Sequence, residues 1–262
     1  MNLSMPGELG DAYTSFSQKA RAVTEAWGKS ELFCPNCSSD CLDQLPNNAK
    51  AADYCCPRCE VRTQLKGKAG KFGRRISDGE YKTFVGELRA GRTPDLLLVE
   101  YHRLTWTVSG AVLVPRFALT ESAIIPRKPL SKKARRAGWQ GCNISLDNVP
   151  LLARIPLVVN GSCRSPGDVR TDYARLRPLN ETQRETRGWT LDVLRIAERF
   201  GAQEFTNAHV YACAPELEKL HPDNKHITDK IRQQLQVLRN LGLLVHVDKG
   251  RWRNVMPAAW HQ

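Results

Sequence analysis

The sequence predicts an α/β protein with a structural zinc site and a small helical domain at its C-terminal end. Three observations support this class. Apolar runs of strand length alternate with helical patterns over the first part of the chain. Two Cys-x-x-Cys pairs lie between residues 34 and 59, and helical segments followed by a hairpin occupy the last part. With 262 residues the chain can form one large domain or two ordinary ones, and its 41% hydrophobic content is enough for their cores.

The zinc prediction rests on the pairs Cys34-Pro-Asn-Cys37 and Cys56-Pro-Arg-Cys59. Four thiolates in two close pairs form the tetrahedral soft-ligand set that zinc prefers. Disulfides would instead need an oxidising compartment and usually a short secreted chain. Cys55 could replace Cys56, but only Cys56 leaves a two-residue gap before Cys59. The spare cysteines are expected to be small buried hydrophobes: Cys41, Cys55, Cys142, Cys163 and Cys213.

Charge and targeting signals indicate where the protein acts and on what. The first ten residues lack the basic and apolar regions of a signal peptide, and no apolar run could span a bilayer. We therefore expect a soluble, cytoplasmic protein that has no membrane partner. The formal net charge of +12 favours a polyanion. Residues 62–75 and 127–139 each carry basic side chains and no carboxylate, which favours phosphate contacts over a merely solvated face.

The elements of the first part are predicted from apolar period and helix-end signals. Helices are expected over 15–29 and over 78–90, the second capped by Ser77 or Asp78. A strand ending at Asp53-Tyr54 is expected between the two cysteine pairs, and another after the second pair, over 60–66. Further strands are expected over 95–101, 109–115 and 155–159. This order suggests an α/β nuclease-like core.

A polar segment around 179–187 has no apolar period, so we place the domain boundary there and predict domains of 1–180 and 181–262. Helices are expected over 189–200, after Asn207 as N-cap, and over 227–241, with a short strand at 204–206. A hairpin turning at Lys249-Gly250 follows. Three helices followed by a hairpin are typical of a winged helix-turn-helix, in which Trp189 is expected in the core.

The last helix divides into two faces. Ile231, Leu235 and Leu238 form an apolar stripe at helical spacing. Gln can bond adenine and Arg guanine in the major groove, whereas Lys225 before the helix and Arg251 in the wing are expected to contact phosphate. A plain solvated face is the alternative. The candidate DNA-binding residues here are Lys225, Thr228, Lys230, Arg232, Gln233, Gln236 and Arg251.

A second constellation surrounds the zinc loop. Asp53, Gln64 and Lys66 have the spacing of the PD-(D/E)xK nuclease motif, whose residues meet across two adjacent strands. In that motif acidic side chains and a backbone carbonyl bind a hard divalent cation, and the Lys orients water and stabilises charge on the phosphate. The spacing alone also arises by chance.

Neighbouring segments make the match specific. Together they resemble the DpnI family of methyl-directed restriction endonucleases, from Tyr13 to about Arg253. The resemblance implies a zinc-bearing PD-(D/E)xK domain, a winged helix, and cleavage of GATC sites that carry N6-methyladenine. It also implies that Asp53 and Lys66 are catalytic and that Leu65 lends a backbone oxygen to Mg. The segments are Ser17-Gln18-Lys19-Ala20-Arg21, Cys34-Pro-Asn-Cys37, Ala52-Asp53, Leu65-Lys66, Arg135-Arg136-Ala137-Gly138-Trp139-Gln140-Gly141-Cys142-Asn143-Ile144, Gly188-Trp189-Thr190 and Lys230-Ile231-Arg232-Gln233-Gln234-Leu235-Gln236.

Position 64 departs from the family, which has Glu where this chain has Gln64. The amide oxygen still coordinates a metal but brings no charge, so magnesium would bind less tightly. We favour activity, because a Q-x-K variant occurs in Mrr-like methyl-directed nucleases. Glu25 or Glu60 could compensate. The alternatives are a methyl-adenine DNA-binding protein with a decayed nuclease site, and a zinc-ribbon factor that binds DNA regardless of methylation.

The methyl group itself offers little binding energy. Burying one carbon yields about 0.8 kcal/mol, which gives less than tenfold discrimination between methylated and unmethylated DNA. If two domains each read a methyl group, their two small discrimination factors multiply. Trp139, which follows Arg135 and Arg136, is expected at an exposed, glycine-flanked loop tip where it could meet the methylated base; a core anchor is the alternative. We expect Zn and Mg, no organic cofactor, adenine-methylated double-stranded DNA as partner, and a monomer in solution.

Overall fold

The chain folds into two units, each assembled from segments that are distant in sequence. The computed structural model describes residues 1–46, 49 and 52–255. The first unit contains Met1–Ile76, Gly86–Arg116 and Arg154–Ala174, and the second contains Ser77–Val85, Phe117–Ala153 and the chain from Arg175 onward. The chain therefore passes between the units several times.

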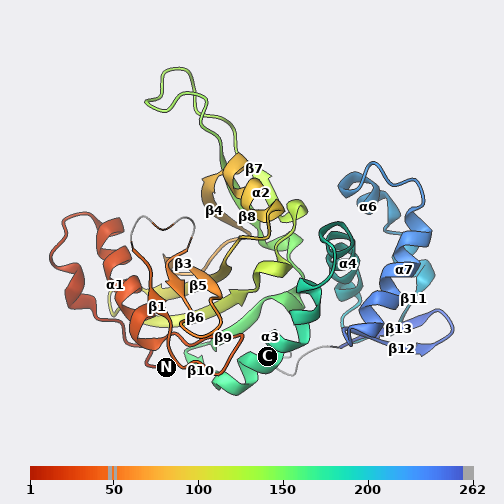
Figure 1. Cartoon of the computed structure of the whole chain (residues 1–262), viewed down its shortest axis with the longest axis horizontal. Coiled ribbons are helices and arrows are strands. Elements are labelled where there is room, and N and C mark those ends of the chain that lie inside the picture. Colours follow the sequence, from red (N-terminus) through yellow and green to blue (C-terminus); the bar gives the residue numbers. More distant parts are fainter. Residues whose placement is uncertain (47–48, 50–51, 256–262) are drawn as a thin grey trace. The chain divides into compact units, whose positions relative to one another are not determined.

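A seven-stranded sheet in the order β1-β2-β3-β5-β6-β9-β10 is the frame of the first unit (Figure 1). Neighbouring strands are antiparallel except β3 and β5, which run parallel. The buried run 96–99 in β5 lies at the centre of this sheet, as its apolar sequence predicts. The strands are β1 (Asp43–Gln44), β2 (Tyr54–Cys55), β3 (Arg62–Ala69), β5 (Asp95–His102), β6 (Thr107–Val114), β9 (Ile155–Val159) and β10 (Ser162–Cys163).

Helix α1 (Phe16–Glu31) packs against β3, which confirms the helix predicted over 15–29. Two glycines allow the close approach. A Cβ on Gly67 would lie 2.9 Å from the Cγ2 of Thr24, and one on Gly28 would overlap the hydroxyl of Tyr54. Because neither glycine has a side chain, the helix can lie directly on β2 and β3. The unit also contains all but the last two residues of α3 (Pro166–Leu176), a helix that was not predicted from the sequence.

The helix predicted over 78–90 begins later than expected. Residues 78–80 belong to β4 (Arg75–Glu80), and helix α2 is Tyr81–Arg89. Strand β4 lies beside β8 (Gly141–Ser145), which pairs with β7 (Ile124–Pro126), in a three-stranded sheet. The hydroxyl of Ser77 lies 3.3 Å from the side-chain oxygen of Asn143 in β8. Pairing with a strand distant in sequence therefore overrides the local helix signal.

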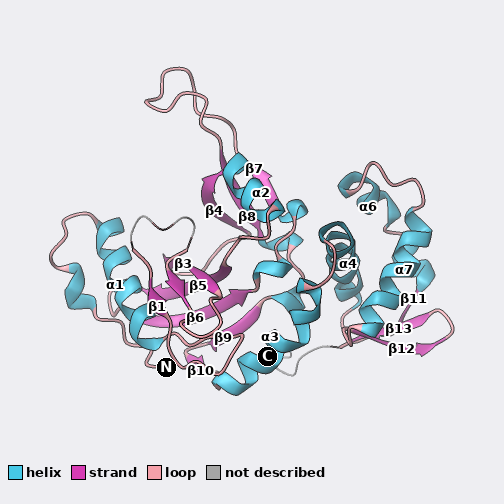
Figure 2. Ribbon diagram, viewed as in Figure 1, coloured by secondary structure: helices cyan, strands magenta, loops and turns pink. Residues whose placement is uncertain are grey.

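From Arg184 to Val255, the described C-terminal part of the second unit has four α-helices and a three-stranded sheet (Figure 2), so α6 is additional to the predicted order. Trp189 is 1% exposed, which confirms its place in the core. Asn207 is not the N-cap of α5, because the Thr206 side chain accepts the hydrogen bond from the His209 N–H. The elements are α4 (Arg184–Ala197), β11 (Phe205–Thr206), α5 (Asn207–Tyr211), α6 (Ala214–Leu220), α7 (Ile227–Asn240), β12 (Leu244–Asp248) and β13 (Arg251–Asn254).

Helix α4 begins five residues before the predicted Trp189, because its first turn is polar and carries no apolar period. None of the helices in the described part of the chain is long and apolar enough to cross a membrane. Short 3-10 helices occupy Gly7–Gly10, Arg116–Ala118, Glu121–Ala123, Leu146–Asn148, Leu151–Ala153, Arg177–Asn180 and Glu198–Phe200.

Candidate functional site

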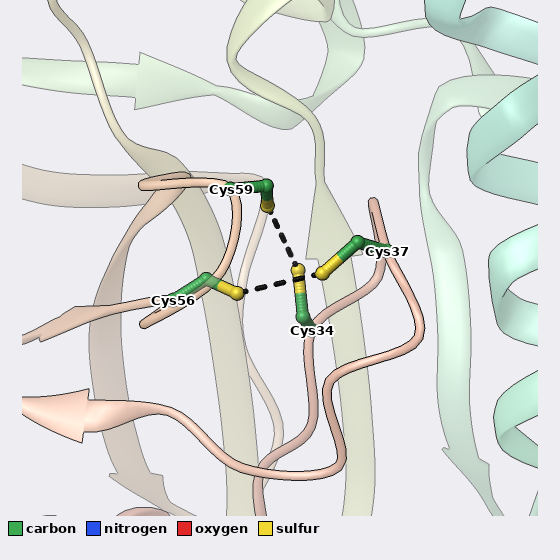
Figure 3. A group of neighbouring side chains, drawn as sticks. All are labelled: Cys34, Cys37, Cys56 and Cys59. Carbon is green, nitrogen blue, oxygen red and sulfur yellow. Dashed lines mark hydrogen bonds between the residues drawn. The ribbon is translucent and has the colours of Figure 1, made fainter.

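The two Cys-x-x-Cys pairs form one cluster of four sulfur atoms (Figure 3). The sulfurs lie within 4.8 Å of one another, and the closest contacts, Cys34 to Cys59 and Cys37 to Cys56, are 3.5 Å. Zn–S bonds of about 2.3 Å in a tetrahedron place sulfurs about 3.8 Å apart, so the cluster can hold zinc. All nine cysteines are free of disulfides, and Cys56 rather than Cys55 belongs to the cluster, as the spacing predicts.

Only one of the spare cysteines is buried. Cys142 lies in β8 inside the second unit, but Cys41 and Cys163 are exposed and Cys55 and Cys213 are half-buried. The expectation of small buried hydrophobes is therefore wrong for four of the five. Cys41 lies in a loop and Cys163 in the edge strand β10, and neither place offers a covering layer.

The second cysteine pair closes the β2–β3 hairpin. The Cys56 N–H donates to the Val61 carbonyl at 2.9 Å, and the pairing of Tyr54 with Thr63 follows on the strands. One step further, the Asp53 N–H donates to the Thr63 carbonyl at 2.9 Å. A metal bound to the cluster would therefore hold the register that sets Asp53 beside the start of the Gln-x-Lys segment.

Arg170 in α3 supports the first cysteine pair, and the sequence analysis missed it. Its guanidinium donates to the carbonyls of Cys34 at 3.1 Å and Ser39 at 2.8 Å, and pairs with Asp40 at 2.9 Å. Such outer contacts orient metal ligands. The Ser165-Pro166 helix start was a signal for α3 in the sequence, but nothing there connects Arg170 with the cysteines.

Asp53, Gln64, Leu65 and Lys66 line a single open cleft of about 490 Å³ beside α1. Gln64 and Lys66 lie on the same face of β3, because alternate residues of a strand share a face. Asp53 reaches them from the neighbouring strand end, and its Oδ2 accepts a 2.7 Å hydrogen bond from the Leu65 N–H. The structure thus brings together the three side chains that the D-x10-Q-x-K spacing singles out.

The charge environment of this cleft suits a cation. Burial raises the pKa of Asp53 above its usual range, the Leu65 N–H opposes that rise, and the nearby Glu25 carboxylate adds to it. Lys66 and Arg21 lower the pKa of Asp53 to a smaller extent. A carboxylate that is costly to ionise and faces a second carboxylate favours a positive ligand between them. Oxygen donors from side chains and backbone are the set that Mg²⁺ prefers.

The lining of the cleft distinguishes Glu25 from Glu60, the two carboxylates that could compensate for the neutral Gln64. Glu25 lines it from α1 and pairs there with Arg21. Its backbone carbonyl accepts a 2.7 Å hydrogen bond from the Tyr54 hydroxyl. Glu60 is exposed in the zinc-loop turn, where its φ is 58°, and does not belong to the lining. Glu25 is therefore the carboxylate that shares the cleft with Asp53.

The second basic stretch forms the long loop between β7 and β8 (Figure 1). Arg135 and Arg136 are exposed on it. Trp139 is half-buried at the base of the loop rather than at its tip, contrary to expectation: the Leu130 N–H donates to its carbonyl at 2.9 Å. The Arg136 guanidinium lies 4.8 Å from the ring centroid, and Gly141 leaves room for the indole edge. The missing side chain of Gly141 therefore leaves space in which the Trp139 ring packs, and it does not place the ring at an exposed loop tip.

Helix α7 shows the predicted division into two faces. Ile231, Leu235 and Leu238 are 0% exposed. Lys225, which precedes the helix, and Arg251 at the start of β13 are exposed. Of the remaining candidates, Thr228, Arg232 and Gln233 are exposed, and Lys230 and Gln236 are half-buried.

Comparison with known families gives two matches that together cover most of the chain. Residues 1–182 match DpnI, the Dam-replacing family, which is a nuclease family. Residues 185–254 match DpnI_C, the Dam-replacing HTH domain. The first match contains the cysteine cluster and the cleft, and the second contains α7 and the hairpin β12–β13. The chain therefore belongs to the DpnI family of methylation-dependent, DNA-targeting proteins.

Proposed function

We propose that this protein is a magnesium-dependent endonuclease that cuts both strands of DNA at GATC-type sites carrying N6-methyladenine. The observation that carries the proposal is the convergence of Asp53, Gln64 and Lys66 in one cleft of a chain from a nuclease family. Cleavage would leave 5′-phosphate and 3′-hydroxyl ends. We assign it to domain 1–180 and assign further DNA recognition to domain 181–262. A DNA substrate also agrees with the cytoplasmic location expected from the sequence.

The cleft residues divide the chemistry among them. Asp53, the Gln64 amide oxygen and the Leu65 carbonyl would hold Mg²⁺, which supplies Lewis-acid activation of the phosphate and of a bound water. The Lys66 ammonium orients the attacking water and stabilises the negative charge that grows on the phosphate. The Leu65 N–H fixes the Asp53 carboxylate by its 2.7 Å hydrogen bond. The PD-(D/E)xK assignment of these residues is part of the proposal.

Glu25 supplies the charge that position 64 lacks. A Glu-to-Gln difference removes one negative charge from the cation site and keeps an oxygen ligand. Glu25 lines the same cleft, and its side chain is 18% exposed. In this proposal the carboxylates of Glu25 and Asp53 face the cation together, and Arg21 neutralises Glu25 when no cation is bound.

Two DNA-binding surfaces then serve methyl recognition. Arg135 and Arg136 on the loop between β7 and β8 would hold phosphates, and Trp139 at its base would offer an apolar face to the methylated base. The outward residues of α7 would read a major groove. Because one methyl group is worth about 0.8 kcal/mol, two readings separate methylated from unmethylated sites better than one.

A comparison of plasmids tests the proposal directly. The protein and Mg²⁺ are incubated with plasmid from an adenine-methylating host and from a non-methylating host. We expect cutting of the first alone, at GATC sites, by a protein that is a monomer in solution. Equal cutting of both plasmids, or cutting of neither, would contradict the proposal.

A second candidate function is methyl-adenine DNA binding without cleavage, which the neutral Gln64 favours. It predicts retardation of methylated DNA in gels with no product, and cutting by a Gln64→Glu variant would show a weakened site. Equal retardation of methylated and unmethylated DNA would instead indicate a zinc-ribbon factor indifferent to methylation.

A further inference from the structure

An aromatic cluster lies at the far end of the cleft that contains Asp53. The cleft continues along β3 to Phe16, Ala69 and Tyr101. The Trp106 ring stacks on Tyr101 at 5.3 Å and on Phe16 at 5.9 Å between centroids. The Arg103 guanidinium lies 4.1 Å from the Phe16 centroid. We name Phe16, Tyr101, Arg103 and Trp106 the Arg103 platform.

Trp106, one of the platform residues, is held in a backbone conformation that an aromatic residue rarely adopts. Trp106 has a φ of 51°, in the left-handed region, where strain is tolerated only if surrounding contacts impose it. Those contacts are present. The Met5 N–H donates to the Trp106 carbonyl at 2.8 Å, and Gly7 lies so close to the indole that a Cβ would overlap it. The N-terminal segment therefore fixes the ring on which the cluster is built.

Two cations in this region have no carboxylate partner among the residues that the structure describes. Arg103 is exposed and contacts the Phe16 ring. Lys68 lines the cleft on the same strand face as Lys66, and its ammonium lies 5.8 Å from the Phe72 centroid. Glu100, the register partner of Lys68, accepts instead the N–H of Phe72 at 2.6 Å. A guanidinium that contacts an aromatic ring can still donate its N–H groups to a phosphate.

We propose that the Arg103 platform and Lys68 bind backbone phosphates of the DNA strand whose cleavage is proposed at Lys66. The strand assignment rests on the proposed function. In the β3–β5 register Lys66 pairs with Leu98 and Ala69 with Tyr101. Three strand residues span about 10 Å. DNA carries one phosphate per about 3.4 Å of axis on each strand, so the contact falls within about three base pairs of the cut. It reads no base and adds affinity equally to all sequences.

Binding measurements with Arg103→Ala test the proposal without relying on cleavage. Fluorescence anisotropy with a short GATC duplex, in Ca²⁺ instead of Mg²⁺, is recorded over a salt series. We expect weaker binding, and a plot of log K against log salt whose slope is smaller by about 0.9 for each lost phosphate contact. The loss is equal for methylated and unmethylated duplexes. Arg103→Lys, which keeps the charge but not the planar fork, lies between wild type and Arg103→Ala. Lys29→Ala, an exposed cation of α1 outside the cleft, binds as wild type does.

Neutral methylphosphonates placed one at a time along the duplex locate the contact. Neutralising one phosphate within about three base pairs of the cut should weaken DNA binding by wild type and leave DNA binding by Arg103→Ala unchanged. An unchanged salt slope in Arg103→Ala, or no phosphate coupled to Arg103, overturns the proposal. A melting curve confirms that the variant is folded. Wild type that binds without cutting contradicts the proposed function alone, and wild type that cuts while Arg103→Ala binds equally well contradicts the platform alone.

Discussion

The hydroxyl of Tyr54 donates a 2.7 Å hydrogen bond to the backbone carbonyl of Glu25, and so joins the hairpin closed by the second cysteine pair to α1. Tyr54 is 0% exposed and directly follows Asp53 in the chain. Burial raises the pKa of Tyr54, so its hydroxyl stays a donor over the physiological range. This bond fixes how the element that carries Asp53 meets the helix that carries Glu25.

Replacing Tyr54 with Phe removes that bond and keeps the ring. We expect the free energy of unfolding to fall by about 1 kcal/mol, measured by denaturant titration. Magnesium affinity, measured by calorimetry without DNA, should fall as well, because α1 is less firmly held. Zinc content should not change. Tyr13→Phe, at an exposed position, is the control, and wild-type magnesium affinity in Tyr54→Phe would contradict the positioning role.

A charge exchange tests whether Glu25 compensates for Gln64. Glu25→Gln should weaken magnesium binding and cleavage by about 10- to 100-fold, because the cation then faces one carboxylate instead of two. Gln64→Glu alone should strengthen magnesium binding. The double variant restores the number of carboxylates and should recover most of the loss.

Calorimetry and plasmid cleavage measure the two effects separately. Glu60→Gln, in the exposed turn, serves as the matched control and should behave as wild type. If Glu25→Gln binds magnesium as wild type does, Glu25 does not supply the charge that position 64 lacks.

Removal of one cluster thiol tests the zinc site. Cys56→Ser should reduce zinc from one ion per chain to about none and lower the melting temperature steeply, since structural zinc contributes about 10 kcal/mol or more to folding. Cleavage should disappear with the hairpin register. Cys163→Ser, an exposed cysteine outside the cluster, should keep its zinc, which elemental analysis measures. A zinc-free wild type with normal stability would contradict this prediction.

The raised pKa of Asp53 predicts how stability depends on pH. Burial is the main cause of the rise. A carboxyl whose pKa is higher in the folded state contributes stability below its unfolded pKa, and that contribution is lost as the pH rises through the folded pKa. Asp53→Asn, which never ionises, should therefore melt above wild type at neutral pH in magnesium-free buffer.

The difference between the two melting temperatures should shrink as the pH falls below the pKa of Asp53. Added magnesium should stabilise wild type and not the variant. If the melting-temperature difference between Asp53→Asn and wild type grew as the pH fell, the prediction that the pKa of Asp53 is raised would be wrong.

Two exposed positions in the C-terminal domain separate base reading from phosphate contact. Gln233→Ala should lose about 1–3 kcal/mol of discrimination between the preferred base and its competitors. Arg251→Ala should weaken all sequences alike and reduce the salt slope by about 1. Both side chains are exposed, so melting temperatures should be nearly unchanged. Equal selectivity in wild type and Gln233→Ala would remove that residue from the reading face.

The parts of the fold that the sequence predicted have strong local signals. β5, β6 and β9 are apolar runs of strand length, and the zinc ligands have fixed spacing. The last residues of β4, 78–80, were mistaken for the first turn of a helix, because the partner strand β8 lies more than sixty residues away. Helix α3 was overlooked although Val169, Tyr173 and Leu176 have helical spacing and are buried.

The choice between Glu25 and Glu60 could not be made from the sequence. It depends on where α1 crosses β3, and that crossing is set by Gly28 and Gly67, two positions without a side chain. The place of Trp139 was missed for a related reason, because Gly141 serves as packing space for the indole and not as a loop signal.

The hydrogen bonds that Arg170 donates near the first cysteine pair join residues far apart in sequence: Cys34 is 136 positions away and Ser39 is 131 positions away. During translation, the first cysteine pair therefore gains these hydrogen bonds only after residue 170 of 262 has left the ribosome. Until then the β2–β3 hairpin beside Asp53 can already form, but the first cysteine pair lacks its contacts with α3. A truncated fragment that ends before Arg170 should therefore bind zinc less tightly than the full chain does, because it lacks this outer contact of the first cysteine pair.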